Sequence, residues 1–372
     1  MGLHTPWLDM KRCVLNADGS VNYYLDPTDS TKKADGSAAV LDGTDGNVMV
    51  EIPKFYFKHE LNGSKNTWRI RTTTYPGYIL HPAFVKAGVE VDYRYIGAYD
   101  ACYLDATDGL YKSGLNLDDM SGNLDLANDK LASVSGVYPL VGVTRNECRT
   151  LAANNGTGWH QLDFALWSAI QMLYLVEYGT FSTHSELGNG NTNGSYVSQS
   201  SNQNDSPHTV AGASNAWGNA STDGTQPSAG AKPGTAYMSY RGIENWYGNC
   251  WTWADGINVN EIAAGNVHIT NDYRDFADGT TTNYTLISSA FPTSSGYIRN
   301  ILNTGAYFLS GDNTGGSSTT YLTDYHYASA SASRVVRVGG RASSGAAAGG
   351  FYLDSGIHAG GADLSFGARL CR

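Results

Sequence analysis

The segment from Gly339 to Arg372, "GGRASSGAAAGGFYLDSGIHAGGADLSFGARLCR", sets isolated reactive side chains in a run of small residues. Five of these side chains could contact a ligand: the cation Arg341, the carboxylates of Asp354 and Asp363, the imidazole of His358 and the aliphatic Ile357. Groups of this kind on a rigid surface can hold a ligand, because a few anchors usually carry most of the energy of an interface. The mixed polarity predicts weak affinity for each copy, so adhesion would need many copies on one particle.

Motifs of catalysis and of metal binding are missing from the sequence. The nine histidines include no pair at i, i+4 and no HExxH, and the chain has no GxSxG, P-loop or GxGxxG after a strand. The stretches "LDGTDGNV" and "LDATDG" lack the EF-hand spacing and indicate turns instead. We therefore predict no catalytic residue, no metal ligand and no cofactor.

The cysteines predict a reduced protein made in a cytoplasm. There are five, Cys13, Cys102, Cys148, Cys250 and Cys371, with no CxxC spacing and no apolar leader at the N-terminus. We therefore expect buried, unpaired thiols and no signal peptide. No apolar run is long enough to span a membrane, and the net charge of −10 argues against a nucleic-acid or anionic-lipid partner.

The elements that must position these residues are mostly strands. The chain of 372 residues contains 25 tyrosines and 44 glycines, a composition typical of a β-rich, loop-rich protein. Two helices are predicted, over 144–156, where Thr144 and Glu147 have capping-box spacing, and over 161–179, with Asp163 near the start and Gly179 at the end. Residues 182–235 are a polar insertion, and residues 1–45 an N-terminal extension for attachment or assembly.

A tryptophan-rich motif, "GIENWYGNCWTWADG", occupies residues 242–256. Trp251 and Trp253 fall on one face of a strand, and Gly248 and Gly256 allow close backbone approach. A buried strand between two tight turns would account for the motif on its own.

The order of several motifs resembles a known family. The tryptophan motif is similar to the "GN-W-W-DG" element of the C-type-lectin fold in its formylglycine-generating-enzyme variant, and "RVVRVGGR" and "FGARLCR" follow it as in that family. Upstream, "VMVEIPKFYFKHE", "GYILHPAF" and "YRYIGAYDACYL" resemble the opening strands of the domain. The resemblance implies an α+β C-type-lectin fold over residues 46–372, with two helices and long loops.

Within this superfamily the chain most resembles the variable proteins of diversity-generating retroelements, such as phage tropism determinants. There a reverse transcriptase mutates adenines, so that AAC codons can become fifteen residue types but never Lys, Glu, Gln, Trp or Met. None of these five types occurs in residues 339–372. A turn region rich in Gly and Ala would explain part of this absence without a retroelement.

The resemblance divides the C-terminal segment into exposed variable positions and a fixed framework. We predict a ligand-facing set made of Arg341, Ser343, Ser344, Ala347, Asp354, Gly356, Ile357, His358, Gly361, Asp363 and Ser365, although some of its small members could be turn residues only. Predicted to point inward are Phe351, Leu353, Phe366 and Leu370, and the buried scaffold comprises Trp251, Trp253, Arg337, Phe351 and Phe366.

The function implied is that of a non-enzymatic adhesin at a virion tail tip. Its partners would be a cell-surface receptor, protein or glycan, and other tail components bound through the N-terminal region. One alternative is a formylglycine-generating-type oxidase, which needs a nearby cysteine pair for copper chemistry; only Cys371 lies near the matching end, with Cys250 far away in sequence. The other is a calcium-dependent sugar-binding lectin, for which no clear carboxylate cluster is evident.

Overall fold

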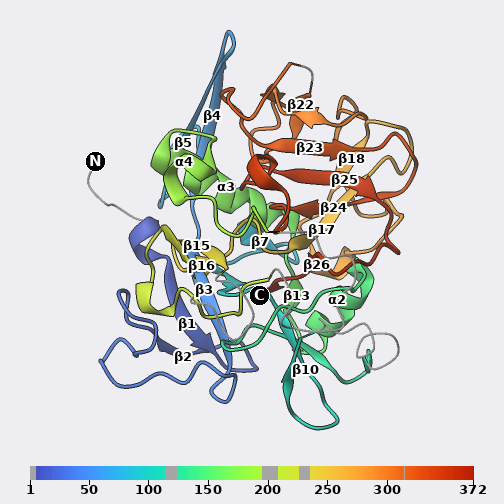
Figure 1. The fold of residues 1–372 in the computed structure, drawn as a ribbon. Coiled ribbons are helices and arrows are strands. Elements are labelled where there is room, and N and C mark those ends of the chain that lie inside the picture. The colour runs from blue at the N-terminus through green and yellow to red at the C-terminus, as the bar shows by residue number, and fades with distance from the viewer. Residues whose placement is uncertain (1–5, 114–123, 195–207, 226–234, 314) are drawn as a thin grey trace.

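Two large β-sheets and a buried central helix make up the body of the protein (Figure 1). The computed structural model describes residues 6–113, 124–194, 208–225, 235–313 and 315–372. The architecture is α+β and rich in strands, as expected. No helix within these ranges is long and apolar enough to cross a membrane.

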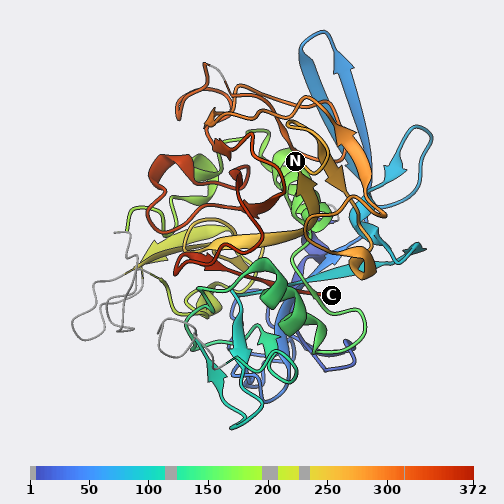
Figure 2. The ribbon, with the colours of Figure 1, turned by 90° about the vertical axis from the view of Figure 1, so that its right-hand side faces the viewer.

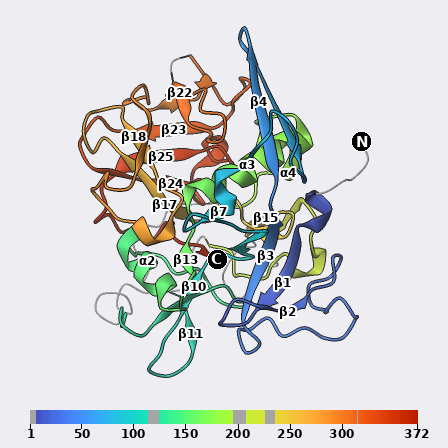
Figure 3. The same ribbon diagram turned by 180° about the vertical axis from the view of Figure 1, so that it is seen from behind.

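The six-stranded sheet joins the two ends of the described chain. Its strands, in spatial order, are β13 (His160–Gln161), β27 (Leu370–Cys371), β9 (Tyr93–Gly97), β3 (Asn47–Pro53), β1 (Lys11–Leu15) and β2 (Val21–Tyr24). The C-terminal strand β27 thus lies inside the sheet, and the C-terminus is near the middle of the molecule when seen from the front and from behind (Figures 1 and 3).

Residues 11–24 contribute strands β1 and β2 to this sheet and do not form a separate extension. Strand β1 pairs with β3 over five residues, from Lys11↔Glu51 to Leu15↔Asn47. Cys13, Val14 and Leu15 are fully buried. The boundary predicted at residue 45 therefore does not separate two structural units, because β1 and β2 before it belong to the same sheet as β3 after it.

The eight-stranded sheet carries the tryptophan motif and the C-terminal segment. Its strands, in spatial order, are β19 (Thr285–Ser288), β18 (Val267–Ile269), β17 (Trp251–Val259), β24 (Arg334–Val338), β25 (Leu353–Ile357), β23 (Tyr325–Ala328) and β20 (Gly296–Tyr297), with β26 (Phe366–Gly367) pairing β17 in parallel. Every residue of β17 is buried. As predicted, Gly248 and Gly256 sit in close approaches: both have positive φ, and a Cβ at either would fall within 3 Å of a backbone oxygen.

Smaller sheets surround these two. One projects from the body and is formed by β5 (Lys65–Arg71), β4 (Tyr56–Asn62) and β6 (Ile79–Leu80) (Figures 1 and 2). The others are β11 (Tyr111–Lys112), β10 (Cys102–Leu104) and β12 (Lys130–Ala132); β14 (Thr222–Thr225), β15 (Ala236–Tyr240) and β16 (Ile243–Glu244); β21 (Asn300–Ile301) with β22 (Ser310–Asp312); and β7 (Val85–Lys86) with β8 (Val89–Glu90).

Both predicted helices form, and the predicted capping box at Thr144 is confirmed. In α2 (Arg145–Ala153) the Thr144 side chain accepts from the Glu147 N–H and the Glu147 carboxylate accepts from the Thr144 N–H, a complete capping box. In α3 (Phe164–Tyr178) Asp163 caps the first turn, and Gly179 ends the helix at φ 70°. Among the described residues, the structure adds the short helix α4 (Thr183–Leu187) and the 3₁₀ turns η1 (Trp7–Asp9), η2 (Pro82–Phe84), η4 (Asn215–Trp217), η5 (Tyr273–Asp275) and η6 (Gly345–Ala347).

Burial anchors the central helix, whereas hydrogen bonds anchor the polar insertion. Residues 164–175 of α3 are all buried, and the helix shares its hydrophobic cluster with β3, β17 and β24. The described parts of the 182–235 insertion are held by polar contacts with the body: Asn191 Nδ2 donates to Asn249 Oδ1 at 2.9 Å, and the Thr209 N–H donates to the same oxygen at 2.8 Å. Residues 195–207 and 226–234 of the insertion lie outside the described residues.

Candidate ligand-binding site

The register of the eight-stranded sheet aligns four side chains in one row. Trp253 on β17 lies opposite Arg337 on β24, Arg337 opposite Asp354 on β25, and Asp354 opposite Tyr327 on β23. Directly opposed residues project from the same face of a sheet. The row therefore brings an indole, a guanidinium, a carboxylate and a phenol together from four separate strands.

A cavity of about 530 Å³ lies over this row, and we call it the C-terminal pocket. A volume of this size is typical of small-molecule sites. Its lining residues come from β17, β23, β24, β25, β26 and the loop after β24: Trp251, Tyr327, Arg337, Arg341, Ser343, Ser344, Tyr352, Asp354, Gly356, Ile357 and Phe366.

Arg337 is the central charged group of the pocket and is 7% exposed. Its guanidinium carbon lies 3.7 Å from the ring centroid of Phe366 and 4.9 Å from that of Trp251, in cation–π geometry. Arg337 Nη2 donates to the Asp354 carboxylate, while Nε and Nη1 have no hydrogen-bond partner. Burial, the largest effect, lowers the pKa of Arg337, and the nearby Asp354 opposes this shift.

The loop after β24 forms one wall of the pocket. The Arg341 N–H donates to Ser344 Oγ at 3.0 Å, and Arg341 Nη1 donates to Ser365 Oγ at 3.0 Å. Ser365 is held in turn by Asp363, whose Oδ1 accepts from the Ser365 hydroxyl at 2.6 Å. These bonds hold the loop against the turn that precedes β26.

Tyr327 forms another wall of the pocket, and the position of its ring depends on the glycine at position 356. The Tyr327 side chain is 50% exposed, and its ring lies against the β25 backbone at Gly356. A Cβ at Gly356 would fall 2.5 Å from that ring, so a larger residue there would displace Tyr327. The width of the pocket is therefore coupled to the side chain at position 356.

Six of the predicted ligand-facing residues line the C-terminal pocket: Arg341, Ser343, Ser344, Asp354, Gly356 and Ile357. His358 is exposed but outside the lining, whereas Ala347 packs against the hydrophobic cluster around Trp253 and Asp363 caps the turn before Ser365. The scaffold and framework residues are all buried as predicted: Trp251, Trp253, Arg337, Phe351, Leu353, Phe366 and Leu370.

Three predicted ligand-facing residues are buried instead of exposed. Asp354 is 3% exposed because its carboxylate turns inward to Arg337. Ser365 is buried as the acceptor for Arg341, and Gly361 is buried beneath Ile357, where a Cβ would fall 2.6 Å from the Ile357 side chain. Asp354 still lines the pocket, but as the partner of a buried cation.

Two lining tyrosines, Tyr327 and Tyr352, were not predicted. Tyr352 packs edge-on against Trp251 with centroids 4.6 Å apart, which completes the aromatic side of the pocket. The alternation "YHYA" at 325–328 indicates a strand with tyrosines on one face, but only its parallel pairing with β25 places Tyr327 at the pocket.

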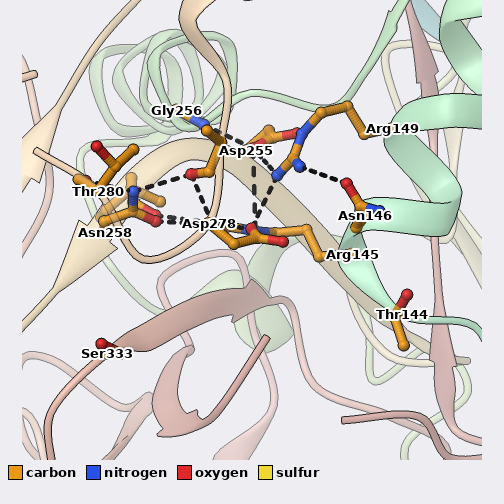
Figure 4. Close-up of polar contacts among 12 residues, drawn as sticks. Thr144, Arg145, Asn146, Arg149, Asp255, Gly256, Asn258, Asp278, Thr280 and Ser333 are labelled. Carbon is orange, nitrogen blue, oxygen red and sulfur yellow. Dashed lines mark hydrogen bonds and ion pairs between the residues drawn. The ribbon is translucent and has the colours of Figure 1, made fainter. Parts of the chain in front are cut away.

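A second polar cluster joins α2 to β17 (Figure 4). Arg149 donates to the Asp255 carboxylate from Nε at 2.7 Å and from Nη2 at 2.9 Å. Its Nη2 also donates to Asp278 Oδ1 at 2.9 Å. Arg145, one turn earlier, is fully buried and donates to Asp278, to Asn258 Oδ1 and to the carbonyl oxygens of β17. The cluster follows Trp253 directly, so it fixes the strand that supports the pocket.

The five cysteines are all buried and form no disulfide. Burial raises the pKa of Cys250 and of Cys371, which favours the protonated thiol. Within the described ranges, no group of three or more His, Cys, Asp or Glu side chains is placed to hold a metal ion.

Comparison with known proteins gives no family. A scan of the sequence against protein-family models finds no match. A search of curated proteins finds no significant match.

Proposed function

We propose that this protein is a ligand-binding adhesin of the C-type-lectin fold, and that the C-terminal pocket is its receptor-binding site. The observation that carries the proposal is a convergence. Six residues from the segment predicted to vary line one cavity, while the residues predicted to be fixed form its buried support. The motif order in the sequence and the α+β architecture are compatible with that fold.

The proposal includes diversification of the pocket by a retroelement. Exposed positions tolerate exchange, since surface substitutions usually change stability by only about 0.5 kcal/mol. Arg341, Ser343, Ser344 and Ile357 are partly exposed in the pocket wall, so exchange there would alter the ligand and leave the sheet intact. A tail-tip location on a virion and a cell-surface receptor as partner complete the proposal.

The oxidase alternative draws no support from the cysteines. Its chemistry starts from reactive thiolates, and the buried thiols of Cys250 and Cys371 have raised pKa values. The calcium-lectin alternative differs in a testable way, because its binding would be lost on chelation.

Two experiments test the proposed function. Sequencing around the gene should reveal a reverse transcriptase and a near-copy of the codons for residues 339–372, with AAC codons at the varying positions. A genomic neighbourhood without them would contradict diversification.

The second experiment is a cell-binding assay. Fluorescently labelled protein should bind cells within a panel of bacteria, and the variant Ser343→Tyr/Ile357→Asp should not. The control Leu61→Asp/Tyr75→Ser, on exposed residues of the projecting hairpin region, should bind like the parent. Equal binding by both variants would place the receptor site elsewhere.

A further inference from the structure

The walls of the C-terminal pocket combine flat aromatic rings with hydroxyl groups. Trp251 on β17 and Tyr327 on β23 are separated in the sheet by β24 and β25, and Tyr352 and Phe366 also line the cavity. Ser343 and Ser344 add hydroxyls at a partly exposed edge. Aromatic faces pack against the C–H face of a sugar ring, and hydroxyls exchange hydrogen bonds with its rim, so this lining suits a polyhydroxylated ring.

The charges in the pocket favour an anion. The lining holds two guanidiniums, Arg337 and Arg341, and one carboxylate, Asp354, in a chain whose net charge is −10. Asp354 engages only Nη2 of Arg337, and the Nε and Nη1 atoms keep no hydrogen-bond partner. Guanidinium groups pair best with planar oxyanions such as carboxylate.

The dimensions set the size of the ligand. A cavity of about 530 Å³ has room for one or two sugar units and is too small for a folded partner to enter. The half-exposed Tyr327 ring, seated on Gly356, stands at the rim, where it can cover one face of a ring.

We propose that the C-terminal pocket binds the carboxylate-bearing terminal residue of an acidic glycan, a uronic or sialic acid. Its carboxylate faces the Arg337 and Arg341 side, its ring packs against Tyr327 and Trp251, and its hydroxyls reach Ser343 and Ser344. This inference rests on the proposed function, since it names the ligand class of the same site.

The test uses the full chain and small sugars as probes. Sodium glucuronate and N-acetylneuraminate are titrated by isothermal calorimetry, with glucose as the matched neutral sugar, because glucose and glucuronate differ only at C6. Three variants are compared: Arg341→Gln, Tyr327→Ala and the control Arg299→Gln, an exposed arginine outside this pocket. A chelator in a parallel titration separates this site from a calcium-dependent one.

The inference expects at least one acidic sugar to bind at least about tenfold more tightly than glucose. Arg341→Gln should remove that preference, Tyr327→Ala should weaken every sugar, and Arg299→Gln and the chelator should change nothing. Both acids binding would identify the carboxylate as the shared determinant, and one alone would identify the source.

Three results would overturn it. They are equal affinity for glucose and the acids, acid binding that survives Arg341→Gln, and no binding of either acid up to about 10 mM. Each of these leaves the cell-binding comparison of the Ser343→Tyr/Ile357→Asp variant untouched, so the ligand class can fail while the receptor-binding function stands. If the sugar titrations and the cell-binding comparison both failed, the receptor-binding function would be rejected as well.

Discussion

At the scale of single residues, Asp354 and Arg337 form a buried ion pair in which each charge compensates the other. The cation lies against three aromatic rings, at 3.7, 4.9 and 5.7 Å from their centroids, with one carboxylate as its hydrogen-bonding partner. Aromatic rings stabilise a cation only partly, so the carboxylate supplies most of the charge compensation. Asp354 is therefore a structural residue in the wall of a binding site.

Replacing Asp354 by Ala should cost about 3–5 kcal/mol of unfolding free energy, because an uncompensated guanidinium would remain buried. His358→Ala, four residues along and exposed, should stay within about 0.5 kcal/mol of the parent. Urea denaturation of both variants checks this. A loss below about 1 kcal/mol for Asp354→Ala would mean that the aromatic rings alone hold the cation.

Asp324 gives the protein a pH-dependent contribution to stability. This carboxyl is 2% exposed and accepts the Phe351 N–H at 2.7 Å, and burial raises its pKa from 3.8 to about 7. The folded state therefore holds a proton between about pH 4 and 7 that the unfolded chain has released. The stabilising contribution of Asp324 is complete below about pH 4 and is lost as the pH rises to about 7.

The variant Asp324→Asn should remove this dependence, since an amide keeps an acceptor for the Phe351 N–H but does not titrate. The free energy of unfolding of the parent, relative to the variant, should fall by up to about 1.4 kcal/mol for each pH unit between about 4 and 7. Urea denaturation at a series of pH values measures it. Parallel curves for the two proteins would show that Asp324 titrates normally.

At the scale of elements, the local signals in the sequence were sufficient to predict helices α2 and α3 but not the short helix α4. Thr144 and Glu147, or Asp163 and Gly179, lie within or at the ends of the element that they define, so their spacing alone predicts the caps. Pairing between distant segments leaves no such local sign. Strand β1, for example, pairs with β3, and no spacing of residues within β1 indicates that partner.

The same limit explains which pocket residues could be predicted. Small residues around Arg341 and Ile357 indicate an exposed surface, and these two line the pocket. An aspartate in the same run, Asp354, carries the same local signal but is buried, because its partner lies on another strand, 17 residues earlier. Tyr327 enters the site through a parallel pairing that no spacing in the sequence encodes.

The free energy of unfolding should depend on the N-terminal cap of helix α2 as it would in an isolated helix. Thr144→Ala removes the acceptor for the Glu147 N–H and one half of the capping box, and should cost about 1 kcal/mol. Thr150→Ala, in the same helix, removes only a bond to the Asn146 carbonyl one turn earlier, and alanine favours a helix, so its effect should be near zero. Thermal unfolding of the two variants compares them directly. Equal losses would mean that the Arg145 and Arg149 contacts hold α2 without its cap.

At the scale of the whole molecule, the five thiols report on global unfolding. All are buried, and they are spread over four separate hydrophobic clusters of the described residues. Native protein should therefore react with no equivalent of Ellman's reagent on the minute timescale, and denatured protein with five. Intact mass of the unreduced protein should match five free thiols. Fast reaction of one thiol before unfolding would reveal a local opening at that cysteine.

The position of strand β27 means that the protein can fold only if its codons are translated in frame through this strand. The strand lies inside the six-stranded sheet, between β9 and β13, and it is encoded downstream of the segment that forms the pocket. A frameshift or a premature stop anywhere in codons 339–365 would remove β26 and β27 together, and with them the strand that joins β13 to β9 and the strand that pairs β17 in parallel. Such a chain could not complete its core and would be left to proteolysis. Folding thus selects against disrupted copies of the segment proposed to vary, because the pocket is displayed only by a chain that is translated in frame through β27.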